Sequence, residues 1–149
     1  MSTDETVTRD LVKTLENGRE GFEKASKKLM ETNEPLMAET FAGYARDRVR
    51  MSAELEALAG GYGDNVQEGS TPAGAMHRSW MAVKDTLSGH DAKGVLGAAA
   101  QGEDHAVTDY EKASREDLSP GLREIVFRQM ADVTSARNHV RTLQENHAK

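Results

Sequence analysis

The chain of 149 residues contains no cysteine, and it has only one Trp, three Tyr, three Phe and three Pro. The absence of cysteine excludes disulfides, a thiol nucleophile and thiolate metal ligands. With few aromatics, the apolar positions are filled mostly by Ala, Leu, Val and Met, a mixture that favours helices over strands. No apolar run approaches the roughly 18 residues of a membrane-spanning helix. The composition therefore predicts a helical protein without a membrane span.

Basic residues are outnumbered, with 19 Lys and Arg against 25 Asp and Glu, so the net charge is −6 and the isoelectric point about 5.4. Nothing clusters enough Lys and Arg to bind nucleic acid or an anionic membrane surface. The first ten residues, MSTDETVTRD, contain no apolar signal core. We expect one cytoplasmic domain over residues 1–149 that binds neither nucleic acid nor membrane.

Four segments repeat apolar residues at intervals of three and four, the period of helices buried along one stripe. The stripes are Val7, Leu11, Leu15, Gly18, Phe22, Ala25 and Leu29; Met37, Phe41, Tyr44, Arg48, Ser52, Leu55 and Ala59; Leu96, Ala99, Glu103, Ala106, Tyr110 and Ala113; and Leu122, Ile125, Gln129, Val133, Ala136, Val140 and Leu143. Before the second, Asn33 can cap the helix, and Pro35 falls in its first turn. Ser119 and Pro120 open the fourth in the same way.

The links between these segments predict the topology. The first and last links are short, which predicts two antiparallel helical hairpins. The middle link, 61–90, is too long for an empty loop, and over 72–88 it has an amphipathic helical pattern: Met76, Trp80, Val83 and Leu87. We expect Trp80 to be buried, so that Trp80→Ala lowers stability by roughly 3–5 kcal/mol. The predicted fold is an all-α, ferritin-like four-helix bundle with a long crossover carrying a short extra helix.

Polar residues interrupt three of the stripes: Arg48, Glu103 and Gln129. A charged side chain in a core needs a partner or a shifted pKa. Arg48 and Glu103 are therefore predicted to pair across the core, with Gln129, Tyr44 and Tyr110 completing a structural polar core. A ligand-binding or catalytic role for the pair is the alternative.

The stretch GEDHAVTDY, residues 102–110, has the composition of a metal or acid–base site. At about 100° per residue only Glu103 lies within the buried stripe. Asp104, His105 and Asp109 are predicted to form a solvated face. Glu103 is then the one residue of the stretch with a special electrostatic role.

Three stretches carry a resemblance to a known family: NGREGF (17–22), GAMHRSW (74–80) and GEDHAVTDYEKA (102–113). In this order they resemble a bacterial four-helix-bundle family of unknown function assigned to the ferritin-like superfamily, over almost the whole chain. The resemblance implies the ferritin-like fold, bacterial origin and stress-linked expression. It supplies no established reaction.

The dinuclear site of that superfamily needs a Glu from each of two helices and Glu-x-x-His from each of the others. This sequence contains no Glu-x-x-His. Arg48 also points inward where a carboxylate is needed, and a fixed cation repels a metal. We expect no cofactor and no catalytic residue, with Glu103 and His139 as the only candidates for metal ligands.

Two functions remain. The first is a non-catalytic bundle that acts through self-association or protein partners. Phe127, predicted to lie roughly opposite the buried stripe of its helix, favours a homodimer. The alternatives are that the crossover helix docks there, or that Phe127 is a single harmless exposed apolar residue. The alternative is an iron- or manganese-binding oxidase or storage protein with a reduced, atypical site.

Overall fold

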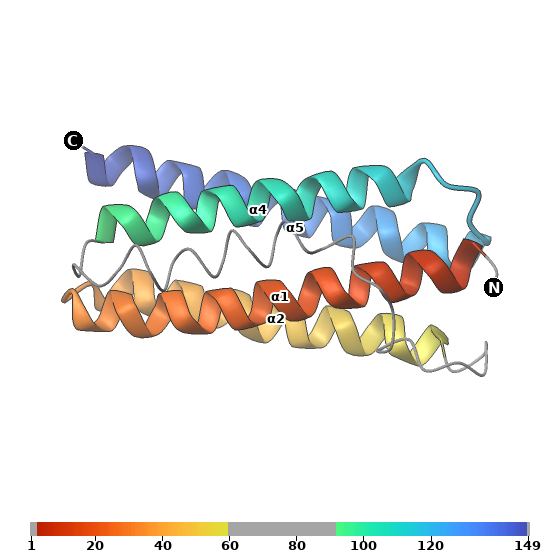
Figure 1. Cartoon of the computed structure of the whole chain (residues 1–149), viewed down its shortest axis with the longest axis horizontal. Helices are drawn as coiled ribbons and strands as arrows, with labels where there is room; N and C mark the ends of the chain where they lie inside the picture. Colours follow the sequence, from red (N-terminus) through yellow and green to blue (C-terminus); the bar gives the residue numbers. More distant parts are fainter. Residues whose placement is uncertain (1–2, 60–91, 149) are drawn as a thin grey trace.

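A computed structural model describes residues 3–59 and 92–148 of the chain. This part contains four helices and no strand: α1 (Thr3–Glu31), α2 (Pro35–Ala59), α4 (Ala92–Ser114) and α5 (Pro120–Ala148). Figure 1 shows them lying lengthwise beside one another. The prediction of an all-helical four-helix bundle is confirmed for the described residues. None of the described helices is both long and apolar enough to cross a membrane.

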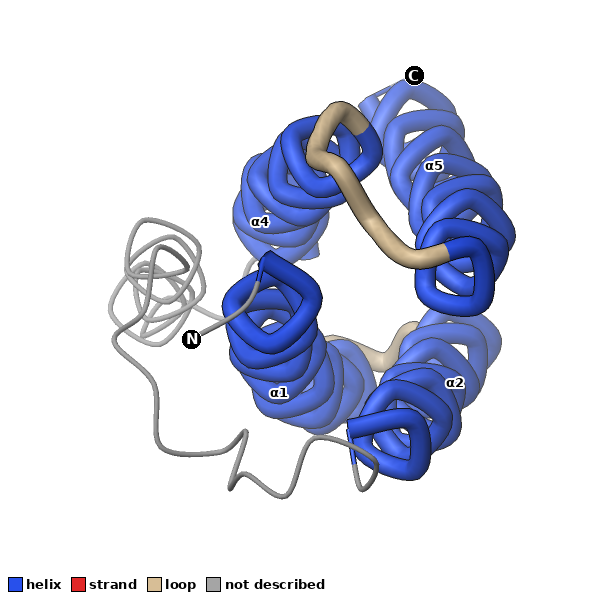
Figure 2. Tube along the Cα trace, turned by 90° about the vertical axis from the view of Figure 1, so that its right-hand side faces the viewer, coloured by secondary structure: helices blue, strands red, loops and turns tan. Residues whose placement is uncertain are grey.

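The helices form a ring when the bundle is viewed along its axis (Figure 2). α1 packs against α2 and α4, and α5 packs against α4 and α2. Helices α2 and α4 are therefore diagonal to each other across the core. Figure 1 shows that they run in the same direction, so the end of α2 and the start of α4 lie at opposite ends of the bundle.

The core is built from the predicted stripes. In α1 and α4 every stripe residue is buried. In α2 the stripe is buried at Phe41, Arg48 and Leu55, and Ser52 is partly buried. In α5 it is buried at Leu122, Gln129, Val133, Ala136 and Val140. Partly buried residues that pack against the core are Met37, Tyr44, Ile125 and Leu143. Helical period and apolar spacing thus orient all four helices correctly, because burying one apolar stripe per helix is the main stabilising contribution of such a bundle.

Asn33 does not cap α2, so that prediction is wrong. Its φ of 64° places it in the left-handed region, where it closes α1. The Glu34 N–H donates to the Leu29 carbonyl at 2.8 Å and the Asn33 N–H to the Met30 carbonyl at 3.1 Å, the two bonds of a Schellman motif. The first turn of α2 instead begins at Glu34, whose carbonyl accepts from Ala38 at 2.9 Å.

The start of α5 follows the prediction. Pro120 is its first residue, and the Ser119 carbonyl accepts the first helical bond from Arg123 at 2.9 Å. The Ser119 N–H also donates to Asp4 Oδ1 at 3.1 Å. This bond ties the start of α1 to the link between α4 and α5.

Several predictions fall on residues outside the described ranges. They are the crossover 61–90, its short helix over 72–88, and the burial of Trp80. These stay predictions.

The left-handed residue at position 33 gives a test. Asn33→Ala should lower the free energy of unfolding by about 1 kcal/mol, because a Cβ-bearing residue without a polar side chain is strained in this region. Asn33→Gly should not lower it, since glycine adopts a positive φ without a steric penalty. Urea unfolding of both variants checks this, and a loss in the glycine variant equal to that in the alanine variant would contradict the assignment.

Candidate functional site

The centre of the bundle holds an ion pair. Arg48 of α2 donates from Nη2 to Glu103 Oε2 of α4 at 2.5 Å, and the two side chains are only 2% and 0% exposed. The pair joins the two diagonal helices. The sequence-based pairing of these residues is therefore present in the structure.

An aromatic ring helps to accommodate the buried cation. The guanidinium carbon of Arg48 lies 5.2 Å from the centroid of the Phe22 ring, within the range of a cation–π contact. Phe22 in turn packs edge-on against Phe41 and tilted against Tyr44, each at 5.3 Å between centroids. The charge of Arg48 is thus held by Glu103 on one helix and by a π face on another.

The pair is only half satisfied. Arg48 Nη1 and Glu103 Oε1 are buried and have no hydrogen-bond partner. Burial raises the pKa of Glu103 above its ordinary value, and the charge and hydrogen bond of Arg48 offset this rise only in part. An unsatisfied charged donor and acceptor are costly inside a protein. The centre therefore contains unused hydrogen-bonding capacity.

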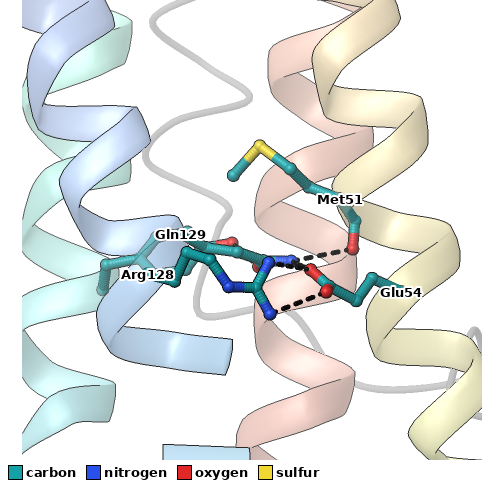
Figure 3. Close-up of polar contacts among 5 residues, drawn as sticks. Met51, Glu54, Arg128 and Gln129 are labelled. Carbon is teal, nitrogen blue, oxygen red and sulfur yellow. Dashed lines mark hydrogen bonds and ion pairs between the residues drawn. The ribbon is translucent and has the colours of Figure 1, made fainter. Parts of the chain in front are cut away.

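A second polar network lies between α5 and α2. The Tyr110 hydroxyl donates to Gln129 Oε1 at 2.7 Å, and Gln129 Nε2 donates to the Met51 carbonyl at 3.1 Å and to Glu54 Oε1 at 2.8 Å. Arg128 completes it with two contacts to the Glu54 carboxylate, at 3.0 Å and 2.8 Å. Figure 3 shows Arg128 and Gln129 of α5 reaching across to Met51 and Glu54 of α2.

This network shifts two pKa values in opposite directions. Burial raises the pKa of the Tyr110 phenol far above its ordinary value. The hydrogen bond from Arg128 lowers the pKa of Glu54. Both groups therefore keep one protonation state at neutral pH, so they act as fixed hydrogen-bond partners.

Tyr44 lies at the edge of the polar core and is partly buried. Its hydroxyl is 2.5 Å from Nδ1 of His139 on α5, and the two rings meet edge-on. His139 itself is exposed. The contact makes a further cross-link between α2 and α5.

The two candidate metal ligands are engaged separately. Glu103 contacts Arg48, and His139 contacts Tyr44. Across residues 3–59 and 92–148, no group of three or more His, Asp or Glu side chains is arranged to hold a metal ion.

The prediction for Asp109 is wrong. Asp109 is partly buried and accepts a hydrogen bond from the Thr14 hydroxyl of α1 at 2.8 Å. Burial raises its pKa and that of Asp10, and Asp109 adds to the rise at Asp10. The prediction of a solvated Asp109 is wrong because α4 packs against α1 as well as against α5, and Asp109 contacts α1. Glu103 is therefore not the only residue of 102–110 with a distinct electrostatic environment.

Asp104 and His105, which were predicted to lie on the same solvated face as Asp109, are partly exposed. Asp104 forms ion pairs with Arg141 at 2.6 Å and Arg137 at 3.5 Å, and its side chain is 44% exposed. Sequence reasoning did not identify Glu54 or Thr14. Thr14 is one turn beyond Asp10 and flanks the buried stripe of α1, a spacing that is visible in the sequence.

The fold and the central cluster define a four-helix-bundle protein whose inward polar side chains contact one another. The chain belongs to the family described as Domain of unknown function (DUF2383), whose model matches residues 5–116. The matched range includes both Arg48 and Glu103. No curated protein and no solved structure matches the chain.

The buried pair predicts a strongly non-additive mutant cycle. Arg48→Met or Glu103→Leu alone should lower the free energy of unfolding by roughly 3–5 kcal/mol, because each leaves a buried charge without its partner. Arg48→Met combined with Glu103→Leu should lower it much less, since no charge remains buried. Urea unfolding of the four proteins measures the coupling. His105→Ala is the control, with a change within about 0.5 kcal/mol, and additive effects in the cycle would contradict the pairing.

The Asp109 environment predicts a pH effect. The pKa of Asp109 is raised in the folded state, so folding favours the protonated carboxyl. The stability that this group contributes is therefore fully present below its unfolded-state pKa, ordinarily 3.8, and is lost as pH rises through its folded-state pKa. Asn cannot ionise, yet its side-chain oxygen still accepts from Thr14. The stability of Asp109→Asn relative to the wild type should therefore increase as pH rises above about 3.8. Unfolding across pH 3 to 7 tests this, and a relative stability that falls with pH would count against it.

Proposed function

We propose that this protein is a ferritin-like bundle that works without catalysis by associating with a second copy of itself. The single observation that carries the proposal is an exposed Phe in a groove on the outer face of α4 and α5. Phe127 is 45% exposed there and lines a hollow of about 650 Å³ with Met130 and Ala131, and polar side chains form the rest of its lining. An aromatic residue surrounded by a polar rim is typical of an association surface.

The charges around this Phe127 groove suit two identical chains. Glu111 in the last turn of α4 and Arg115 just after the end of that helix line the groove and are exposed. In a two-fold dimer the same surface meets itself. An antiparallel pairing then places Glu111 of each chain opposite Arg115 of the other. A groove edged by both signs of charge thus supports a second copy better than a partner of one charge sign.

The state of the core supports a role without catalysis. Arg48 and Glu103 contact each other, and Tyr110 and Gln129 do the same. Reactive groups of enzymes need an accessible cleft beside them. Glu103, the carboxyl at the bundle centre, has a raised pKa but is fully buried.

The ferritin-like assignment is supported by topology. Helices α2 and α4 run in parallel, so the chain between them has to connect opposite ends of the bundle (Figure 1). A long connection between two hairpins is the ferritin-like arrangement. Under this proposal residues 1–149 form one domain with its crossover over 61–90, in a cytoplasmic bacterial protein with stress-linked expression and no cofactor.

A second candidate function is an atypical iron or manganese site. The observation favouring it is the unpartnered Glu103 Oε1 at the bundle centre, since a carboxylate oxygen is a ligand that these metals accept. Metal analysis of the purified protein and an iron-oxidation assay distinguish this candidate. Two tightly held metal ions per chain would favour it over the non-catalytic proposal.

Self-association is tested at Phe127. Phe127→Glu places a charge in the centre of the proposed dimer contact and should shift the protein from dimer to monomer. Leu36→Glu is the matched control, because Leu36 is an 85% exposed apolar residue on α2. Sedimentation velocity at tens of micromolar measures both. A wild-type monomer, or equal dissociation in both variants, would contradict the proposal.

A further inference from the structure

The seam between α2 and α5 is pinned at two places. Toward the start of α2, Tyr44 contacts His139. Toward its end, Gln129 donates to the Met51 carbonyl and to Glu54, as Figure 3 shows. These cross-links are about two to three turns apart on α2 and almost three turns apart on α5. They fix the spacing of the helices over the intervening stretch.

A hollow of about 190 Å³ lies between the two cross-links, with Arg48, Met51, Asp132, Ser135 and Ala136 among its lining residues. The two α5 residues that face Arg48 at mid-seam, Ser135 and Ala136, have small side chains. They leave space that a larger residue would fill. The hollow is smaller than the roughly 300–1,000 Å³ sites of drug-sized ligands, so it suits only a small molecule.

The hollow has an unsatisfied cation at its buried end. Arg48 is 2% exposed, and its Nη1 has no hydrogen-bond partner although Nη2 contacts Glu103. A guanidinium with a free N–H group favours a carboxylate or another anionic oxygen. Arg48 thus places a guanidinium with one unpartnered nitrogen among the residues that line the hollow.

The outer end of the hollow carries the opposite charge. Asp132 and Ser135 are exposed and three residues apart on α5, so they share one face of the helix. Within the described residues neither side chain forms a hydrogen bond or an ion pair. The other lining carboxylate, Asp47, is already bonded to Arg50 at 3.1 Å. One free anionic group and one hydroxyl are therefore available at the outer end.

We propose that this hollow binds a small zwitterionic α-amino acid, with the ligand carboxylate on Arg48 and the ligand ammonium on Asp132 and Ser135. The arrangement selects a zwitterion because a lone anion would satisfy Arg48 and leave Asp132 unpaired. A lone cation would do the reverse. The hollow shares Ser135 with the Phe127 groove. Arg48 and Asp132 do not line that groove, so ligand binding at them is tested separately from self-association.

The properties of Glu103 are compatible with such a ligand. Glu103 contacts Arg48 through Nη2, which leaves Nη1 for a ligand carboxylate. Arginine also has enough N–H donors to contact two carboxyl groups at once. The existing ion pair therefore remains in place when the ligand binds.

Three matched probes test the proposal in a ¹⁵N-labelled NMR titration of the full chain. L-Alanine carries both charges, propionate lacks the ammonium and ethylamine lacks the carboxylate. We expect L-alanine to shift amides on both sides of the hollow, in 44–51 and 132–136, in a saturable way. Propionate and ethylamine should each bind at least roughly tenfold more weakly than L-alanine, since each loses a charged hydrogen bond.

A variant pair locates the site without disturbing the core. Asp132→Asn should weaken L-alanine binding roughly tenfold, whereas Glu124→Gln, an exposed carboxylate on α5 outside the hollow, should leave it unchanged. Both positions are on the surface, so both variants are expected to fold. No saturable shift with L-alanine or glycine, equal binding of propionate, or an unaffected Asp132→Asn variant would each overturn the proposal.

Discussion

A guanidinium and a carboxylate buried together at the bundle centre, Arg48 and Glu103, set the main constraint on this structure. Either charge would be prohibitively costly to bury alone. Together they link the diagonal helices α2 and α4, which make few other contacts, and so they specify which faces of these helices turn inward. The stability gained from such a pair is often small. We therefore regard the pair chiefly as a device that fixes helix register.

The pair also determines where chemistry is available. The central side chains satisfy one another, apart from Arg48 Nη1 and Glu103 Oε1. The hollows and polar contacts outside the centre lie between neighbouring helices. They are the Phe127 groove between α4 and α5, the Asp109–Thr14 contact between α4 and α1, and the hollow over Arg48 between α2 and α5.

The sequence was sufficient for features that depend on helical period. The apolar stripes were correct, and the interruptions at Arg48 and Glu103 implied an inward pair because uncompensated charges are not buried. The sequence was insufficient where the same residue is compatible with two different local structures. Asn33 suits both a helix N-cap and a left-handed closing residue, and only the tertiary path selects the second. Asp109 was misassigned because a single-stripe description of α4 omits its contact with α1. The contact between Tyr44 and His139 joins positions 95 residues apart, and no local pattern encodes it.

The central claim is that Glu103 is a fully buried carboxyl paired to Arg48 through one oxygen. The most direct measurement is the titration of its side-chain carboxyl by ¹³C NMR, with the resonance assigned through Glu103→Gln. We predict a pKa above the ordinary 4.5 of a glutamate, because burial outweighs the contact with Arg48. A Glu103 pKa at or below 4.5 would contradict the account, since the carboxylate would then be solvated or fully satisfied by its partners.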